Sequence, residues 1–326
     1  MQITYSIPFL TLLPTFITAL APTHLIYEAP NDTWLENLAV RGCGSILLTT
    51  TTSPDLWLIN PFTPSPTPNL LHRFSSGSFT VGITETIPDT FQVIVASATL
   101  ENNSIYTVSF PINSDVPLIH LAATVSGAGL LNGLATLNPN TVLAADSYKG
   151  VVWAIDTLTG ASRIAISDPL MAPLTTSVFE STIGINGIKL RGSTLYLTNS
   201  AQALFAKMKI QPNGTAINAA EVIAHSPPGT TYDDFALDEG GDAFLATSQG
   251  NTIEEIGRAG EPQIIVAGNI NSTEIAEPTA AQFGRTLADR DVLYVTTAGG
   301  LEAPINGDER VGGQLVAVDT RGLWSA

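Results

Sequence analysis

Residues 186–199 read NGIKLRGSTLYLTN: a polar start, a short apolar piece, a turn with glycine, and a hydrophobic run ending in Thr-Asn. Two apolar stretches joined by a tight turn predict a β-hairpin. Five other segments share this arrangement: 37–50 (NLAVRGCGSILLTT), 83–97 (ITETIPDTFQVIVAS), 132–146 (NGLATLNPNTVLAAD), 233–247 (DDFALDEGGDAFLAT) and 283–297 (FGRTLADRDVLYVTT). Their starts lie 46, 49, 54, 47 and 50 residues apart. A repeat of about 45–50 residues with four strands is typical of propeller blades, so the sequence predicts an all-β, six-bladed β-propeller.

The rest of each repeat supplies the outer strands of its blade. A third strand follows each hairpin, at residues 55–60, 104–110, 151–156, 204–210, 252–257 and 314–319. A fourth strand follows the first five of these, for example residues 118–125 (LIHLAATV). Too few residues follow Asp319 to complete blade six, so residues 24–29 (HLIYEA) are expected to close it and hide its edge. The alternative, a β-sandwich or two small β domains, does not predict six units in like register.

Charge and cysteine content exclude several classes of partner and stabilising bond. Hydrophobic residues make up 44% of the chain, charged residues 13%, and the formal net charge is −16. Such a surface repels phosphate backbones and anionic lipid, which argues against nucleic acid as a partner. Cys43 is the one cysteine, so no internal disulfide forms, and we expect it to be buried at a strand start.

The N-terminus resembles a secretory leader. Residues 3–21 (ITYSIPFLTLLPTFITALA) carry no charge and end in an A-x-A pattern, and Pro8 and Pro14 would break a membrane-spanning helix. We therefore expect a signal peptide at residues 1–21, a propeller domain at 22–326, and a secreted or secretory-pathway protein with no membrane span after cleavage. Four Asn-x-Ser/Thr sequons are candidate glycosylation sites: Asn31, Asn102, Asn213 and Asn271.

Polar residues recur where the inner strands begin, which is one mouth of a propeller's central channel. Counting back eleven residues from the middle of each hydrophobic run, or ten in the shorter blade four, gives four such positions: Glu36, Asn132, Asn186 and Asp233. In blades two and six the positions are Gly82 and Phe283, which cannot ligate through side chains. Two carboxylates and two amide oxygens suit one divalent cation such as Ca²⁺. The alternative is that they only hydrogen-bond turns or ordered water.

With these motifs the chain resembles the SMP-30/gluconolactonase/strictosidine-synthase-like six-bladed propellers over nearly its whole length. In gluconolactonase-type members, one Glu, two Asn and one Asp from four blades hold a divalent metal. The resemblance places these ligands at Glu36, Asn132, Asn186 and Asp233. The wording of the repeats (ENLAVR, IGINGIK, DDFALD, LYVTTAGG) is closer to a fungal branch that includes hetero-Diels–Alderases of tropolone–sesquiterpenoid biosynthesis.

The leading hypothesis that follows is a fungal secondary-metabolism cyclase of the hetero-Diels–Alder type. Asn132, Asn186 and Asp233 would orient a small hydrophobic polyketide or terpenoid intermediate by hydrogen bonds. Aromatic residues near the same mouth are candidate pocket walls, although aromatic residues also serve as packing: Trp34, Phe179, Tyr232, Phe235 and Phe283. The alternatives are a metal-dependent lactone hydrolase and a non-catalytic ligand-binding propeller. The protein is expected to be a monomer.

Overall fold

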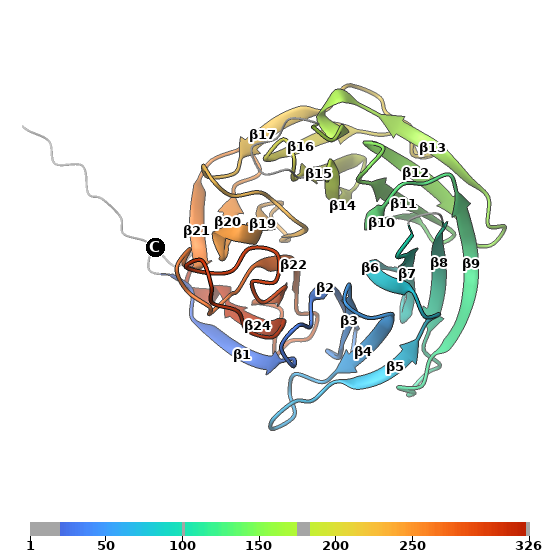
Figure 1. Ribbon diagram of the computed structural model, residues 1–326. Coiled ribbons are helices and arrows are strands. Elements are labelled where there is room, and N and C mark those ends of the chain that lie inside the picture. Colours follow the sequence, from blue (N-terminus) through green and yellow to red (C-terminus); the bar gives the residue numbers. More distant parts are fainter. Residues whose placement is uncertain (1–19, 100–101, 175–182, 324–326) are drawn as a thin grey trace, which may run out of the picture.

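The computed structural model describes residues 20–99, 102–174 and 183–323. Within these ranges six four-stranded antiparallel sheets are arranged in a ring around a common axis (Figure 1). The first strand of blades one to five lies innermost and the fourth lies on the outside. The predicted six-bladed propeller is therefore confirmed. No helix among the described residues is long and apolar enough to span a membrane.

The blades follow one another in chain order. Blade one comprises β2 (Leu35–Val40), β3 (Ile46–Thr50), β4 (Asp55–Ile59) and β5 (Asn69–Arg73). Blades two and three comprise β6 (Ser78–Ile87), β7 (Thr90–Ser97), β8 (Asn102–Ser109), β9 (Leu118–Ser126), β10 (Leu131–Asn138), β11 (Thr141–Asp146), β12 (Val151–Asp156) and β13 (Ser162–Ser167). Blades four and five comprise β14 (Ile185–Arg191), β15 (Thr194–Asn199), β16 (Leu204–Lys209), β17 (Glu221–His225), β18 (Phe235–Leu237), β19 (Ala243–Ala246), β20 (Thr252–Ile256) and β21 (Gln263–Gly268). Blade six comprises β22 (Pro278–Phe283), β23 (Val292–Thr297), β24 (Gln314–Asp319) and β1 (Thr23–Glu28).

Blade six is closed by the N-terminal strand, as the sequence predicted. β1 pairs antiparallel with β24, with Thr23 opposite Val318 and Glu28 opposite Gln314. In Figure 1 the N-terminal strand lies along the outer side of the C-terminal blade. The first and last strands of the described chain therefore share one sheet, which links the two ends of the ring.

The hydrophobic core lies between the blades, which explains why the second strands are continuous apolar runs. In β11, Val142 and Ala144 pack with residues of blade two, whereas Leu143 and Ala145 pack with residues of blade four. Successive side chains of a strand point to opposite faces of the sheet. Because both faces of a blade are covered by neighbouring blades, both sets must be apolar.

Arg41, directly after β2, ties blade one to blade two. Its side chain is only 4% exposed, and Nε and Nη1 lie 2.9 Å and 2.6 Å from carboxylate oxygens of Asp89 and Asp115. The guanidinium carbon also lies 3.8 Å from the centre of the Phe110 ring. The carboxylates and the aromatic face together offset the cost of burying this cation.

Arg41→Ala is expected to lower the free energy of unfolding by about 2–3 kcal/mol, because a hydrogen bond to a charged group contributes about 1.5–3 kcal/mol. Asp89 and Asp115 limit the loss because they are 36% and 76% exposed and can rehydrate. Arg290→Ala is the control, since Arg290 is 66% exposed and lies 3.9 Å from Asp291. Urea unfolding measures both variants, and equal midpoints would contradict the proposed role of Arg41.

Three expectations about the surface have different outcomes. Cys43 is exposed in the turn between β2 and β3, so the expectation that it is buried is wrong. Of the sequons, the side chains of Asn31, Asn213 and Asn271 are exposed, and the side chain of Asn102 lies outside the described residues. Glycosylation at these sites stays a prediction.

Most of the predicted leader, residues 1–19, lies outside the described part of the chain. Ala21, which the predicted cleavage would remove, is buried, and its backbone N–H donates to the carbonyl of Val266 at 2.7 Å. The described fold therefore includes Ala21. The signal peptide and its cleavage position stay predictions.

Candidate functional site

Bulges in the inner strands set the direction of the predicted site residues. In β2, β10 and β14 the pairing with the second strand of the blade shifts across Glu36, Asn132 and Asn186, respectively. A β-bulge leaves residues unpaired and redirects their side chains. All three residues are buried at the start of an inner strand, so the bulges place them at one mouth of the channel.

The glycines that follow two of these residues let adjacent blades approach closely. A Cβ atom on Gly133 would lie 2.4 Å from the carbonyl oxygen of Asn186. A Cβ atom on Gly187 would lie 2.4 Å from a carboxylate oxygen of Asp234. Real Cβ atoms are not found at such distances, so only glycine fits at these two positions. Each Asn-Gly pair therefore places a polar side chain at the site and, in the next residue, a glycine against the neighbouring blade. The predicted site residues are thereby brought to neighbouring positions around the channel.

A cavity of about 460 Å³ opens at this mouth and brings the four predicted polar residues together. Its volume lies within the range of small-molecule sites, about 300–1,000 Å³. Its lining combines the four predicted residues with an apolar wall and further polar groups: Glu36, Asn132, Asn186 and Asp233; Trp34, Phe79, Val81, Leu130 and Ile183; Thr51, Ser200, Thr231, Ser248, Gln249 and Glu302. No Lys, Arg or His of the described residues lines it.

Of the predicted aromatic wall residues that the structure describes, only Trp34 lines this cavity. Tyr232 and Phe235 are fully buried in the core between blades four and five, where Phe235 packs edge-on against Phe205. Phe283 packs edge-on against Phe244 and lines the cavity at the opposite end of the channel. The prediction that these three residues line the site is therefore wrong. Phe179 lies outside the described residues.

The equivalent positions in blades two and six also differ from the prediction. In β6 the bulge lies at Val81-Gly82, and Val81 lines the cavity. Gly82 instead corresponds to the packing glycine, since a Cβ atom there would lie 2.1 Å from the carbonyl oxygen of Asn132. In β22 the pairing shifts at Thr279, whereas Phe283 is the last residue of the strand. The count from the hydrophobic run was one residue off in blade two and gave the wrong end of the strand in blade six.

Glu36 is a buried acid in contact with the aromatic wall. The indole N–H of Trp34 donates to Glu36 Oε2 at 2.6 Å. Burial raises the pKa of Glu36 to about 7, the charges of Asp234 and Glu302 add to this, and the hydrogen bond from Trp34 opposes it. A large share of Glu36 is therefore protonated near neutral pH, and a neutral carboxyl group can donate a hydrogen bond.

Asp233, which is half-buried, is the second acid of the cavity. Burial raises its pKa well above the ordinary value, and the charges of Glu36, Asp234 and Glu302 act in the same direction. A hydrogen bond from the side chain of Asn186 opposes the shift. Because no described cationic side chain lines the cavity, the carboxyl groups of Glu36 and Asp233 favour their neutral forms there.

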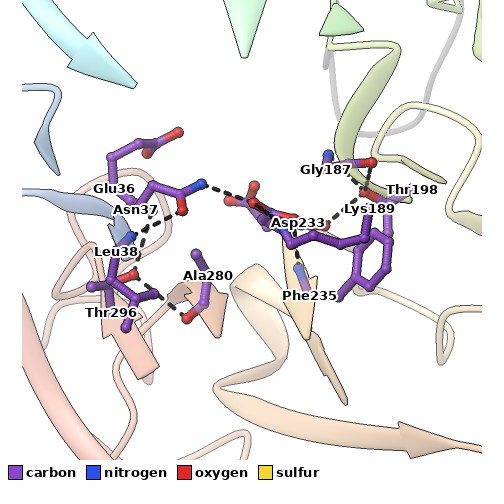
Figure 2. Close-up of polar contacts among 11 residues, drawn as sticks. Glu36, Asn37, Leu38, Gly187, Lys189, Thr198, Asp233, Phe235, Ala280 and Thr296 are labelled. Carbon is purple, nitrogen blue, oxygen red and sulfur yellow. Dashed lines mark hydrogen bonds and ion pairs between the residues drawn. The ribbon is translucent and has the colours of Figure 1, made fainter. Parts of the chain in front are cut away.

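A second set of polar contacts joins the inner strands of different blades next to Asp233 (Figure 2). Lys189 Nζ lies 2.6 Å and 2.7 Å from the two carboxylate oxygens of Asp234, and Asn37 Nδ2 donates to the same carboxylate at 2.9 Å. In Figure 2, Asn37 and Lys189 approach the segment that holds Asp233 and Phe235 from opposite sides. Asn37 and Lys189 also line a cavity of about 490 Å³ at the other end. Lys189 therefore forms its ion pair with Asp234, and it is not part of the lining of the cavity at Glu36 and Asp233.

A hard divalent cation fits the donor set of the cavity. Asn186 Oδ1 is buried and has no hydrogen-bond partner, which singles it out among the buried side-chain polar atoms of the described chain. Its Nδ2 donates to Ser200 Oγ at 3.0 Å. Across the described ranges, no three His, Cys, Asp or Glu side chains form a metal-ligand group. A cation would therefore depend on the amide oxygens of Asn132 and Asn186 as well as on Glu36 and Asp233.

Sequence reasoning missed most of the apolar wall and one acid. Phe79 is the second residue of β6 and Leu130 directly precedes β10, so each lies two residues before the bulge position of its blade. This constant offset was visible in the repeats and could have identified them. Glu302 comes from a long loop after β23 that has no counterpart in the other repeats, so no register argument could place it.

Fold and site together define a six-bladed propeller with an acid- and amide-lined cavity at one mouth. Residues 170–299 match the family described as SMP-30/Gluconolactonase/LRE-like region, which agrees with the resemblance predicted from the repeats. This range contains Asn186 and Asp233. The structure is similar to that of luciferin-regenerating enzyme, with a TM-score of 0.65 and 17% identity, covering 93% of this chain and 96% of the other.

Two relatives carry the name hetero-Diels-Alderase. The chain is 28% identical to "Putative hetero-Diels-Alderase" from Phoma sp, over 84% of this chain and 86% of the relative. It is also 28% identical to "Putative hetero-Diels-Alderase asR5" from Sarocladium schorii, over 93% of this chain and 84% of the relative. The predicted resemblance to the branch that includes hetero-Diels–Alderases is thereby confirmed. The names and the family match indicate an enzyme.

Proposed function

We propose that the protein catalyses a hetero-Diels–Alder cycloaddition of a small hydrophobic intermediate in the cavity at Glu36 and Asp233. The observation that carries the proposal is the composition of this cavity: its lining combines an aromatic and aliphatic wall with the carboxyl groups of Glu36 and Asp233, and no described cationic side chain belongs to it. The two relatives named for this reaction support it.

The reaction needs geometry and polarisation rather than a nucleophile. A heterodiene and an alkene form two σ bonds, one of them to oxygen, at the expense of two π bonds overall, and no atom leaves. The apolar wall of Trp34, Phe79 and Leu130 can hold both partners in contact, which converts a bimolecular reaction into an intramolecular one. A neutral carboxyl group of Glu36 or Asp233 can donate to the heterodiene oxygen, where negative charge develops.

A metal-dependent lactone hydrolase is the second candidate, because the unpartnered Asn186 Oδ1 and the match to the gluconolactonase-containing family favour it. Glu36, Asn132, Asn186 and Asp233 would hold the cation, and both acids would have to be ionised. A bound cation would supply Lewis-acid polarisation of the lactone carbonyl. The two candidates thus require opposite protonation states of the same carboxyl groups.

The discriminating experiment offers the purified protein two reactions. The first is the cycloaddition of an α,β-unsaturated ketone with an enol ether, which is monitored by measuring the enantiomeric excess of the dihydropyran product. The second is hydrolysis of a δ-lactone, and each is run in EDTA and in millimolar CaCl₂. We expect enantioenriched cycloadduct that does not depend on the cation. Racemic product at the uncatalysed rate, with Ca²⁺-dependent lactone hydrolysis, would replace this proposal by the lactonase.

The pH dependence of the rate should separate the candidates independently. If neutral Glu36 is the donor, kcat is flat below about pH 7 and falls above it, approaching about tenfold per pH unit, because the pKa is raised to about 7. Cation binding needs ionised carboxylates, so a lactonase would instead lose activity as the pH falls through 7. A pH profile of the enzymatic rate, corrected for the uncatalysed reaction, gives the sign directly.

A further inference from the structure

A loop after β23 brings a third carboxylate to the cavity. Gly299 and Gly300 both have positive φ angles, 74° and 79°, and start the loop. The loop then folds back on itself, with Ile305 and Glu309 exchanging two backbone hydrogen bonds of 2.9 Å, and Val311 N–H donates to the carbonyl of Gly299. Its geometry is thus fixed by its own backbone, and Glu302 at its start lines the cavity.

The side chain of Glu277 binds the backbone of this loop. Its side chain is 1% exposed, and its carboxylate accepts the backbone N–H groups of Glu302 and Ala303 at 3.2 Å and 3.0 Å. Its own backbone has φ 56°, a left-handed conformation that costs a non-glycine residue free energy. The backbone N–H of Glu277 is in turn bonded to Asn251 Oδ1 at 2.8 Å. A buried acid in a strained conformation is thus used to position the segment that carries Glu302.

Two hydrogen-bond acceptors of the cavity lining, Asn186 Oδ1 and the Glu302 carboxylate, can take a donor from a ligand. Asn186 lines the cavity and is only 5% exposed. Its Oδ1 has no hydrogen-bond partner within the described chain. Glu302 adds an exposed carboxylate on the same cavity, and no Lys, Arg or His of the described residues lines it. An unpaired buried acceptor is costly until a donor reaches it. The cavity is therefore complementary to a ligand that brings its own donor.

We propose that Glu302 is a specificity-determining residue that selects ligands carrying a hydrogen-bond donor, a protonated amine or a hydroxyl group, on an apolar body. Glu277 is its positioning residue. This inference rests on the proposed function only in taking the cavity as the substrate site. It adds the chemical class of the substrate: a hydrogen-bond donor group of the substrate would bind the carboxylate of Glu302, while the apolar body of the substrate contacts Trp34 and Phe79.

The test uses three probes that share one ring system: 1-naphthylmethylamine, 1-naphthylmethanol and 1-naphthoate. Calorimetric titration of the full chain in EDTA should show the amine or the alcohol binding at least about tenfold more tightly than the carboxylate, since like charges oppose it. Glu302→Gln should weaken amine binding about fivefold, the range of a partly exposed ion pair. Glu309→Gln changes the same charge on the same loop outside the cavity lining and should alter each affinity less than twofold.

Glu277 gives the second arm of the test. Glu277→Ala should reproduce the loss seen with Glu302→Gln, and Glu277→Gln should restore part of it, because an amide oxygen can still accept one loop N–H. If Glu277→Ala does not fold, the Glu302→Gln result decides alone. Equal affinity for all three probes, or equal effects of Glu302→Gln and Glu309→Gln, would overturn the proposal. Donor preference without cycloaddition would reject the reaction and keep the specificity, so the two failures are distinguishable.

Discussion

Glu36→Ala is expected to lower the rate of the enzymatic cycloaddition about 100- to 1,000-fold, the usual loss for one preorganised donor. Glu36→Gln is expected to lower it by less than about tenfold, because a side-chain amide keeps both a donor and an acceptor. The acceptor still takes the indole N–H of Trp34, now 2.6 Å from Oε2, so the aromatic wall should keep its position. The measurement is kcat and enantiomeric excess for both variants, with Glu309→Gln as an exposed control.

The same pair of variants tests the competing reaction. If Glu36 is a metal ligand, Glu36→Gln should be nearly as damaging as Glu36→Ala, since an amide oxygen lacks the carboxylate charge. Equal losses in the two variants, together with activity that responds to Ca²⁺, would therefore contradict the donor role.

Stability gives an activity-independent check on Glu36. Its pKa is raised from 4.5 to about 7 by burial, so the folded state binds the proton more tightly than the unfolded state. Stability is then fully present below pH 4.5 and falls as pH rises toward 7, by about 1.4 kcal/mol per pH unit at most. Glu36→Gln should reduce the slope of stability against pH between pH 5 and 7, to which the raised pKa of Asp233 also contributes, and an unchanged slope in urea unfolding would show that Glu36 is not one of the groups responsible.

The repeat was readable from the sequence because its cause is local. A second strand such as β11 is covered on both faces, so its run VLAA is apolar without alternation, and the turn before it is short. Closure by β1 followed from counting, because blade six lacked one strand. These features need no knowledge of how the blades face one another.

The polar side of the site was predicted because the bulge recurs at a constant distance from the run. The count failed in blade two, where β6 is ten residues long and starts at Ser78, before the predicted start at Ile83. Tyr232 and Phe235 lie beside Asp233 in the chain but pack between blades, because small changes in position turn a side chain from the channel to the inter-blade core. The prediction for Phe283 was wrong for another reason. Phe283 is the last residue of β22, so the length of this strand places it at the opposite end of the channel.

Removing residues 1–29 is expected to destabilise the propeller by several kcal/mol. The deletion removes β1, whose register matches five residues to β24, and backbone hydrogen bonds contribute about 0.5–1.5 kcal/mol each. It also removes Ile26 and Tyr27, which pack against the core between blades six and one. Since the whole fold is stable by only about 5–15 kcal/mol, this loss is a large fraction of the total.

The deletion also leaves the backbone of β24 without its outer partner. An unpaired edge is a template for association with other chains, so we expect aggregation, or a soluble protein whose Tm is lower by about 10 °C or more. Removing residues 1–19 is the matched control, because it retains β1 and the buried Ala21, whose N–H is bonded to Val266. Thermal unfolding and light scattering compare the two truncations with the full chain. If the longer deletion stays soluble with the Tm of the control, β1 does not close the ring, and the two ends of the chain are held together by the contacts of β22 and β2 between adjacent blades.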